Sequence, residues 1–155
     1  MIHLKRLLVA TDFSSCSKKA LHYAEAFSER FGSEIHLLHV VEDLSPLLPA
    51  AGPGVPVLGA AMAEIQTKAD QALQAIPVAE AAAKNGVVKV IRNGSPHGEV
   101  VKYAKEAEID MIILGTHGRT GLTHILLGSV AEKILRHAPC PVLTVRPQEH
   151  EFVTP

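Results

Sequence analysis

Short runs rich in apolar residues alternate with longer segments of helical periodicity along the whole chain. The runs lie at residues 3–10, 34–41, 87–92, 110–114 and 142–145. Alternation of this kind is typical of a parallel sheet with right-handed crossovers, because a parallel neighbouring strand is reached only through a long connection. The pattern therefore predicts one α/β domain over residues 1–155, with helices on both faces of a doubly wound sheet.

The predicted helices carry recognisable start and stop signals. Gly32 is expected to end the first helix, because glycine adopts the left-handed conformation that closes many helices. Ser95 and Pro96 are suited to the cap and the first position of a later helix. The segment 60–85 has helical composition, but Pro77 lacks an N–H and clashes with the preceding turn, so we expect a kink or a split there.

Composition narrows the possible partners and the compartment. The net charge is −1 and the pI is near 6.7, which gives no general attraction to nucleic acid or to an anionic membrane. Cys16 and Cys140 have neither metal-binding nor redox spacing, which fits a reducing compartment. We therefore expect a cytoplasmic protein, with neither nucleic acid nor a membrane among its partners.

One uncharged stretch, residues 44–63, is about as long as the roughly 20 residues that span a bilayer. It contains four prolines and three glycines. These would interrupt a membrane helix and leave its backbone groups unpaired in lipid. We expect residues 44–58 to form a flexible surface loop within the domain.

A glycine-rich segment follows the run at 110–114. It contains Gly115-Thr116-His117-Gly118, then nine residues, then Gly128-Ser129. Glycine permits positive φ and lets a ligand approach the main chain, which we expect at positions 115 and 118. A helix that starts near Ser129 would direct free N–H groups and its positive dipole end at an anion. The segment predicts a phosphate site, although glycines also close ordinary turns between strands and helices.

At these residues the chain resembles the universal stress protein family, in particular the members with a G-x2-G-x9-G-(S/T) nucleotide motif. Gly115, Gly118, Gly128 and Ser129 match that motif in full. The resemblance covers nearly the whole chain, and the other matching segments are residues 11–14, 39–41, 94–96 and 138–145. It implies a Rossmann-like, adenine nucleotide α-hydrolase-like domain with a five-stranded parallel sheet.

The resemblance also implies positions for an adenine nucleotide. Thr11 and Asp12 should lie beside Gly115 at the carboxyl edge of the sheet. Asp12 is assigned to the adenosine side, near any nucleotide-bound magnesium, and the main chain of Val40 is assigned to the adenine ring. An alternative is that Asp12 or Ser14 only caps the first helix.

The remaining candidates lie around the glycine-rich segment. His117 and Arg119 could reach phosphate or ribose, or Arg119 could be a solvated loop residue, and Val130 offers an N–H to phosphate. ATP is the expected ligand, with Mg²⁺ or Mn²⁺. The predicted nucleotide-binding residues are Thr11, Asp12, Val40, Leu114, Gly115, His117, Gly118, Arg119, Gly128, Ser129 and Val130.

Local motifs assign neither a catalytic centre nor a metal site built by the protein. The chain has no G-x-S-x-G or C-x-x-C motif. His36 and His39 should face opposite sides of a strand, because successive side chains alternate. We expect a binding protein with at most weak ATP hydrolysis.

The last strand, Val142, Leu143, Thr144 and Val145, lies between prolines, which favours a sheet edge. The resemblance implies that a homodimer forms through this strand, and the alternative is an edge capped within the monomer. Our leading hypothesis is an ATP-binding, homodimeric stress-response protein whose nucleotide state acts on an unknown protein partner. The alternatives are a slow metal-dependent ATPase and an interaction module that binds no nucleotide.

Overall fold

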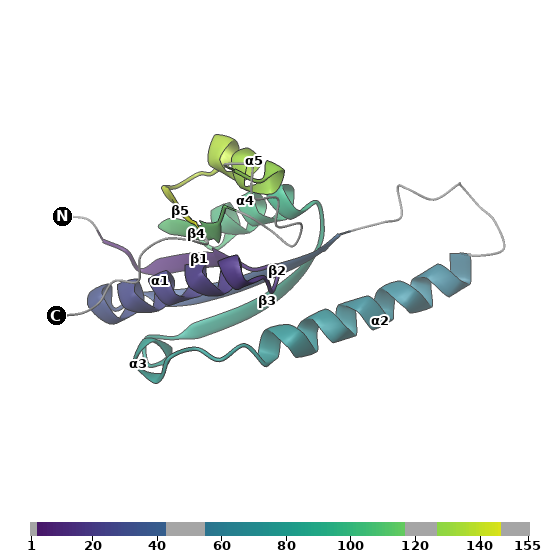
Figure 1. Ribbon diagram of the computed structural model, residues 1–155, viewed down its shortest axis with the longest axis horizontal. Helices are drawn as coiled ribbons and strands as arrows, with labels where there is room; N and C mark the ends of the chain where they lie inside the picture. The colour runs from purple at the N-terminus through teal and green to yellow at the C-terminus, as the bar shows by residue number, and fades with distance from the viewer. Residues whose placement is uncertain (1–2, 43–54, 117–126, 147–155) are drawn as a thin grey trace.

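The computed structural model describes residues 3–42, 55–116 and 127–146 (Figure 1). Strands and helices alternate as the sequence predicts. The elements in chain order are β1 (Arg6–Ala10), α1 (Ser15–Phe31), β2 (Glu34–Glu42), α2 (Val55–Gln74), α3 (Glu80–Ala83), β3 (Val87–Gly94), α4 (Pro96–Glu106), β4 (Met111–Gly115), α5 (Ser129–His137) and β5 (Val142–Val145).

The strands form one parallel five-stranded sheet with the order β3-β2-β1-β4-β5. Leu7 of β1 pairs with Ile35 of β2 on one side and with Met111 of β4 on the other. The chain thus moves outward from β1 in one direction and returns to build β4 and β5 in the other. This reversal confirms the predicted doubly wound architecture, and it opens a crevice at the carboxyl ends of β1 and β4.

Helices cover both faces of the sheet. Leu7 and Val9 pack in one cluster with Ala20 and Ala24 of α1, together with residues of α2 and α3. Leu8 packs in a second cluster with residues of α4 and α5. Both clusters are apolar, as expected for parallel strands that are buried on two sides. Figure 1 shows α4 and α5 together above the sheet, away from α2 and α3.

The ends of α1 follow the sequence signals. The Ser14 Oγ accepts a hydrogen bond of 3.2 Å from the Ser17 N–H, so Ser14 caps the first turn. Gly32 has φ of 71° and its N–H bonds to the Ser28 carbonyl, which confirms its role as the stop. In contrast, the Ser95 hydroxyl bonds to His97 Nδ1 at 2.9 Å instead of capping the backbone of α4.

The segment predicted as one interrupted helix is split into α2 and α3, and Pro77 lies between them. Lys89 of β3 donates hydrogen bonds to the carbonyls of Gln74 and Ile76, at 2.8 and 2.7 Å, and so satisfies the end of α2. At its other end, α2 already begins at Val55. Residues 55–58, expected in the loop, are therefore helical, and residues 44–54 lie outside the described residues.

The first turn of that helix explains the difference. Pro56 is the second residue of α2, where the missing N–H would have no intrahelical partner in any case. A proline there does not oppose the helix. Within the described ranges, no helix combines the length and the apolar character needed to cross a bilayer.

β1 is shorter than the predicted run at 3–10. The N–H groups of Lys5 and Arg6 donate to Asp110 Oδ2 at 2.7 and 2.9 Å. A side chain therefore replaces the neighbouring strand at this point, and β4 begins only after Asp110.

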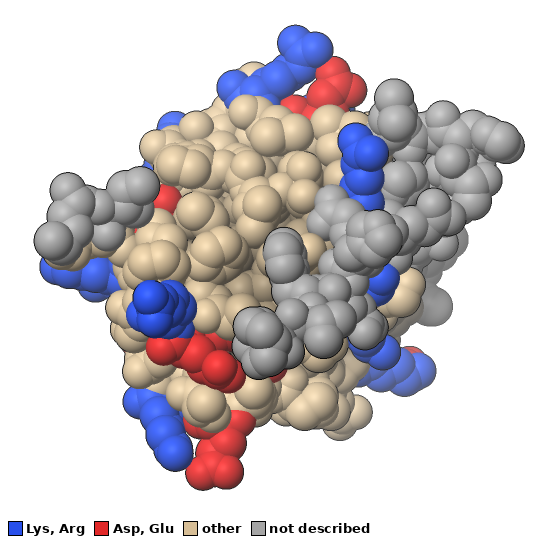
Figure 2. Space-filling model, turned by 60° about the vertical axis from the view of Figure 1, so that its left-hand side comes forward, with Lys and Arg blue, Asp and Glu red and all other residues tan. Residues whose placement is uncertain are grey.

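On the face shown in Figure 2, basic and acidic residues lie near one another at the margins around an uncharged centre.

Candidate functional site

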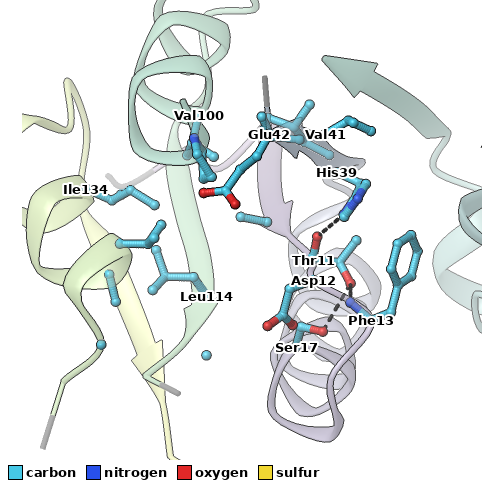
Figure 3. Close-up of a pocket in the computed structure, with 18 of the residues that line it drawn as sticks. Thr11, Asp12, Phe13, Ser17, His39, Val41, Glu42, Val100, Leu114 and Ile134 are labelled. Carbon is cyan, nitrogen blue, oxygen red and sulfur yellow. Dashed lines mark hydrogen bonds between the residues drawn. The ribbon is translucent and has the colours of Figure 1, made fainter. Parts of the chain in front are cut away.

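A pocket of about 810 Å³ opens at the carboxyl edge of the sheet, where the strand order reverses (Figure 3). The ends of β1, β2 and β4 form its floor. Helix α2 contributes from one face of the sheet, and α4 and α5 contribute from the other. The pocket therefore lies where small ligands of open α/β sheets usually bind.

Every predicted nucleotide-binding residue that the structure describes lines this pocket. These residues are Thr11, Asp12, Val40, Leu114, Gly115, Gly128, Ser129 and Val130. His117, Gly118 and Arg119 lie outside the described residues. Segments at residues 11–12, 40, 114–115 and 128–130, far apart in the sequence, thus share one cavity.

The turn between β1 and α1 is held by its own side chains. The Thr11 Oγ1 accepts a hydrogen bond of 3.1 Å from the Phe13 N–H and lies 3.0 Å from the Ser17 Oγ. The Ser14 N–H donates to Asp12 Oδ1 at 3.0 Å. Of the two capping alternatives, Ser14 caps α1, whereas Asp12 braces the turn that precedes it. This bond holds the Asp12 side chain in place where it lines the pocket (Figure 3).

His39 of β2 holds the same turn from the neighbouring strand. Its Nδ1 lies 2.7 Å from the Thr11 carbonyl, and Nδ1 must donate because a carbonyl only accepts. The Phe13 ring lies against the imidazole with 4.3 Å between centroids. Phe13 has φ of 67°, an unfavourable conformation for a side chain of this size. His39 was not among the predicted site residues, although it directly precedes Val40.

The expectation of positive φ at Gly115 is wrong, because its backbone lies outside the left-handed region. A Cβ at this position would instead lie 2.6 Å from Cys16 Sγ. Gly128 has φ of −67°, and a Cβ there would lie 3.1 Å from the Thr116 carbonyl oxygen. These two glycines allow close packing of backbone segments; Gly118 lies outside the described residues.

The N-terminus of α5 forms one end of the pocket. Gly128 caps the helix without a side chain that could accept from the first turn. The first N–H groups of a helix have no intrahelical acceptor, and they lie at the positive end of its dipole. Because Ser129 and Val130 line the pocket, this end suits an anion such as phosphate.

The rest of the pocket contains residues that the sequence analysis did not select. Apolar side chains of Val100, Leu114 and Ile134 form a wall, and the carboxylate of Glu42, the last residue of β2, is directed toward them (Figure 3). Lys68 of α2 also lines the pocket, and its ammonium lies 2.6 Å from a Glu64 carboxylate oxygen. Glu42 could have been found from its place at the carboxyl end of a predicted strand.

In the described ranges, the histidine side chains do not form a metal centre. No group of three or more His, Cys, Asp or Glu side chains is placed there to hold an ion. His36 bonds to the Tyr103 hydroxyl at 2.7 Å on the α4 face, whereas His39 faces the β1–α1 turn, so the predicted opposition of the two is confirmed. Asp12 and Glu42 are the carboxylates that line the pocket in the described part of the chain.

Comparison with known proteins gives the family. Residues 3–146 match the model of the universal stress protein family. Universal stress protein MJ0531 of Methanocaldococcus jannaschii is 33% identical over 150 residues, which cover 95% of this chain and 85% of the relative. The structure of the universal stress protein UspA from Lactobacillus plantarum has a TM-score of 0.74 at 26% identity, covering 94% of this chain and all of that one.

A more distant structure shares the fold. The universal stress protein from Archaeoglobus fulgidus in complex with dAMP has a TM-score of 0.54 at 18% identity, covering 94% of this chain and 99% of that one. The family model spans almost the whole described chain, and the MJ0531 relative is similar over nearly its full length. The chain therefore belongs to the universal stress protein family.

Proposed function

We propose that this protein binds ATP in the pocket at the carboxyl edge of the sheet and acts as a nucleotide-dependent regulator in the stress response. The observation that carries the proposal is the pairing of two features in one cavity. The N-terminus of α5 suits phosphate, and the Asp12 carboxylate lies at the end of β1. A relative of the same fold is known in complex with dAMP, which supports an adenine nucleotide as the ligand class.

Different residues would bind the phosphates, the ribose and the adenine ring. Ser129 and Val130 would bind the phosphates, with Gly118 and Arg119 as further proposed contacts. Asp12 would accept hydrogen bonds from ribose hydroxyls, because an ionised carboxylate only accepts. The main chain at Val40 would meet the adenine edge. Mg²⁺ or Mn²⁺ would enter with the phosphates.

The proposed protein is a homodimer that pairs through β5. β5 is the last strand at one edge of the sheet, and β4 is its neighbour there. An edge strand with unpaired backbone groups is a template for association, and a symmetric dimer covers it. An unidentified protein partner would read the nucleotide state of the dimer.

Calorimetric titration of nucleotide-free protein with ATP tests the proposal. We expect binding in the wild type and at least about tenfold weaker binding in Asp12→Asn, because a hydrogen bond to a charged group is lost. Asp70→Asn is the matched control, since Asp70 is an exposed carboxylate of α2 that does not line the pocket. A wild-type protein that is folded and binds no ATP at millimolar concentration would contradict the proposal.

Binding should also stabilise the fold. A ligand present at a hundred times its Kd adds about 2.7 kcal/mol to the free energy of unfolding when it binds only the native state. Urea unfolding with and without ATP measures this increment independently of calorimetry. The increment should be retained in Asp70→Asn and reduced in Asp12→Asn.

A further inference from the structure

Glu42 is the last residue of β2 and pairs in register with Gly94 of β3. Side chains alternate along a strand, so Glu42 lies on the same face as Val40. Val40 packs against the cluster that α4 and α5 form on that face. Figure 3 shows the Glu42 carboxylate directed into the pocket, toward the apolar wall.

The wall opposite this carboxylate is apolar and tightly packed. Val100, Leu114 and Ile134 are exposed by only 2%, 4% and 1%, respectively, and all three line the pocket. A flat heterocycle placed against such a wall would lose water from its faces, which is favourable for an aromatic ring. Its polar edge groups would then need partners within the pocket.

Glu42 is available as such a partner. Within the described part of the chain its side chain makes no hydrogen bond or ion pair, whereas Asp12 accepts from the Ser14 N–H and Lys68 pairs with Glu64. An ionised carboxylate accepts hydrogen bonds and cannot donate them. The complementary ligand group is therefore an N–H donor.

Two charged features of the pocket also bear on the direction of a bound nucleotide. The N-terminus of α5 attracts negative charge, whereas the Glu42 carboxylate repels it. Phosphates are thereby favoured at Ser129 and Val130, and the base is directed toward Glu42. The base and the carboxylate then meet at the apolar wall.

We propose that Glu42 is a specificity-determining residue, which selects purines with a 6-amino group by accepting a hydrogen bond from that group. A 6-oxo purine would present an acceptor oxygen at position 6 to an acceptor-only carboxylate, and its N1–H donor lies at a different ring position. Glu42 is exposed to solvent, so the expected discrimination is that of one hydrogen bond to a charged group. The inference rests on the proposed nucleotide function and adds the side chain that recognises the base.

Titration with ATP and with inosine triphosphate tests the inference, because inosine carries an oxygen in place of the 6-amino group, together with a proton on the neighbouring N1. Wild-type protein should bind ATP about tenfold to a hundredfold more tightly. In Glu42→Gln the ratio should fall to within about threefold, since the amide both donates and accepts. Glu29→Gln, an exposed change on α1, should keep the wild-type ratio.

The outcomes separate this inference from the proposed function. Tight ATP binding with the same ratio in wild type and Glu42→Gln would overturn the role of Glu42 and leave the nucleotide function intact. Absence of binding of either triphosphate to folded wild type would overturn both. Inorganic tripolyphosphate should bind Glu42→Gln at least as tightly as wild type, because the substitution removes a negative charge and no phosphate contact; weaker binding would contradict the assigned direction of the nucleotide.

Discussion

Gly115 lies where the end of β4 passes the first turn of α1. A Cβ at this position would lie 2.6 Å from Cys16 Sγ and 3.1 Å from the Cys16 carbonyl carbon. The Cys16 thiol is itself fixed, because it is buried and donates to the Val145 carbonyl at 3.3 Å. Any side chain at 115 would therefore push α1 away from the sheet beside Asp12.

Gly115→Ala should lower the free energy of unfolding by about 1–3 kcal/mol, the usual cost of overpacking a filled core. Gly59→Ala is the control, since a Cβ there has nothing within 4 Å. That change lies inside α2 and should raise stability by about 0.5–1 kcal/mol through helix propensity. Urea unfolding of both variants measures the difference, and equal effects would mean that the contact with Cys16 is harmless.

The sequence predicted that Gly115 belongs to the site but not why glycine is needed there. Its glycine-rich neighbourhood suggested positive φ, whereas the constraint comes from Cys16, which is far away in the sequence. His39 was missed for a related reason, because its partner Thr11 belongs to another element and no local pattern shows that contact. Glu42 was missed although it directly follows a predicted strand, at the sheet edge where ligands bind. Asp12 could be predicted because strand ends of a doubly wound sheet meet at one edge.

At the scale of elements, the cap of α1 also supports the site. Ser14 accepts from the Ser17 N–H, and the Ser17 hydroxyl donates to the Ser14 carbonyl at 2.9 Å while it contacts Thr11. The helix start and the turn that orients Asp12 therefore share one hydrogen-bond network. Loss of the cap should affect both.

Ser14→Ala should destabilise the protein by about 1 kcal/mol, the typical value of a serine cap. Ser15→Ala is the matched control, because Ser15 is the exposed first residue of the same helix and should change stability by less than about half as much. Urea unfolding midpoints compare the two substitutions. A Ser15→Ala effect as large as that of Ser14→Ala would show that the cap bond contributes little.

Periodicity located the elements, but several of their ends depend on distant partners. β5 and the split near Pro77 agree with the prediction. The start of β1 does not, because the Asp110 carboxylate binds the N–H groups of Lys5 and Arg6. The start of α2 was hidden by Pro56, which local rules treat as a helix breaker although it is tolerated in the first turn.

For the whole molecule, β5 as the outermost strand of the sheet is the feature that bears on assembly. The carbonyls of Pro141 and Val145 accept from the N–H groups of Ile112 and Thr116, so these residues face β4. Backbone bonding alternates along a parallel strand. Val142 and Thr144 therefore direct their N–H and carbonyl groups away from the sheet.

Thr144→Pro should convert the proposed dimer to a monomer, because it removes an outward N–H while it leaves the bonds to β4. Thr144→Val keeps the backbone donor and should remain dimeric. Sedimentation equilibrium at matched concentrations distinguishes the two, and circular dichroism checks that both are folded. A folded Thr144→Pro protein that stays dimeric would place the dimer contact on another surface.

Thr116 connects the pocket to this edge of the molecule. It lines the pocket and accepts from the Gly128 N–H at 2.7 Å, and its own N–H donates to Val145 at 2.9 Å. One residue thus touches the candidate ligand cavity and the end of the candidate dimer strand. If a nucleotide that shifts Thr116 changes the dimer dissociation constant, thermodynamic linkage requires that dimerisation change nucleotide affinity by the same coupling free energy. The protein concentration would then set how sensitively the chain responds to its ligand.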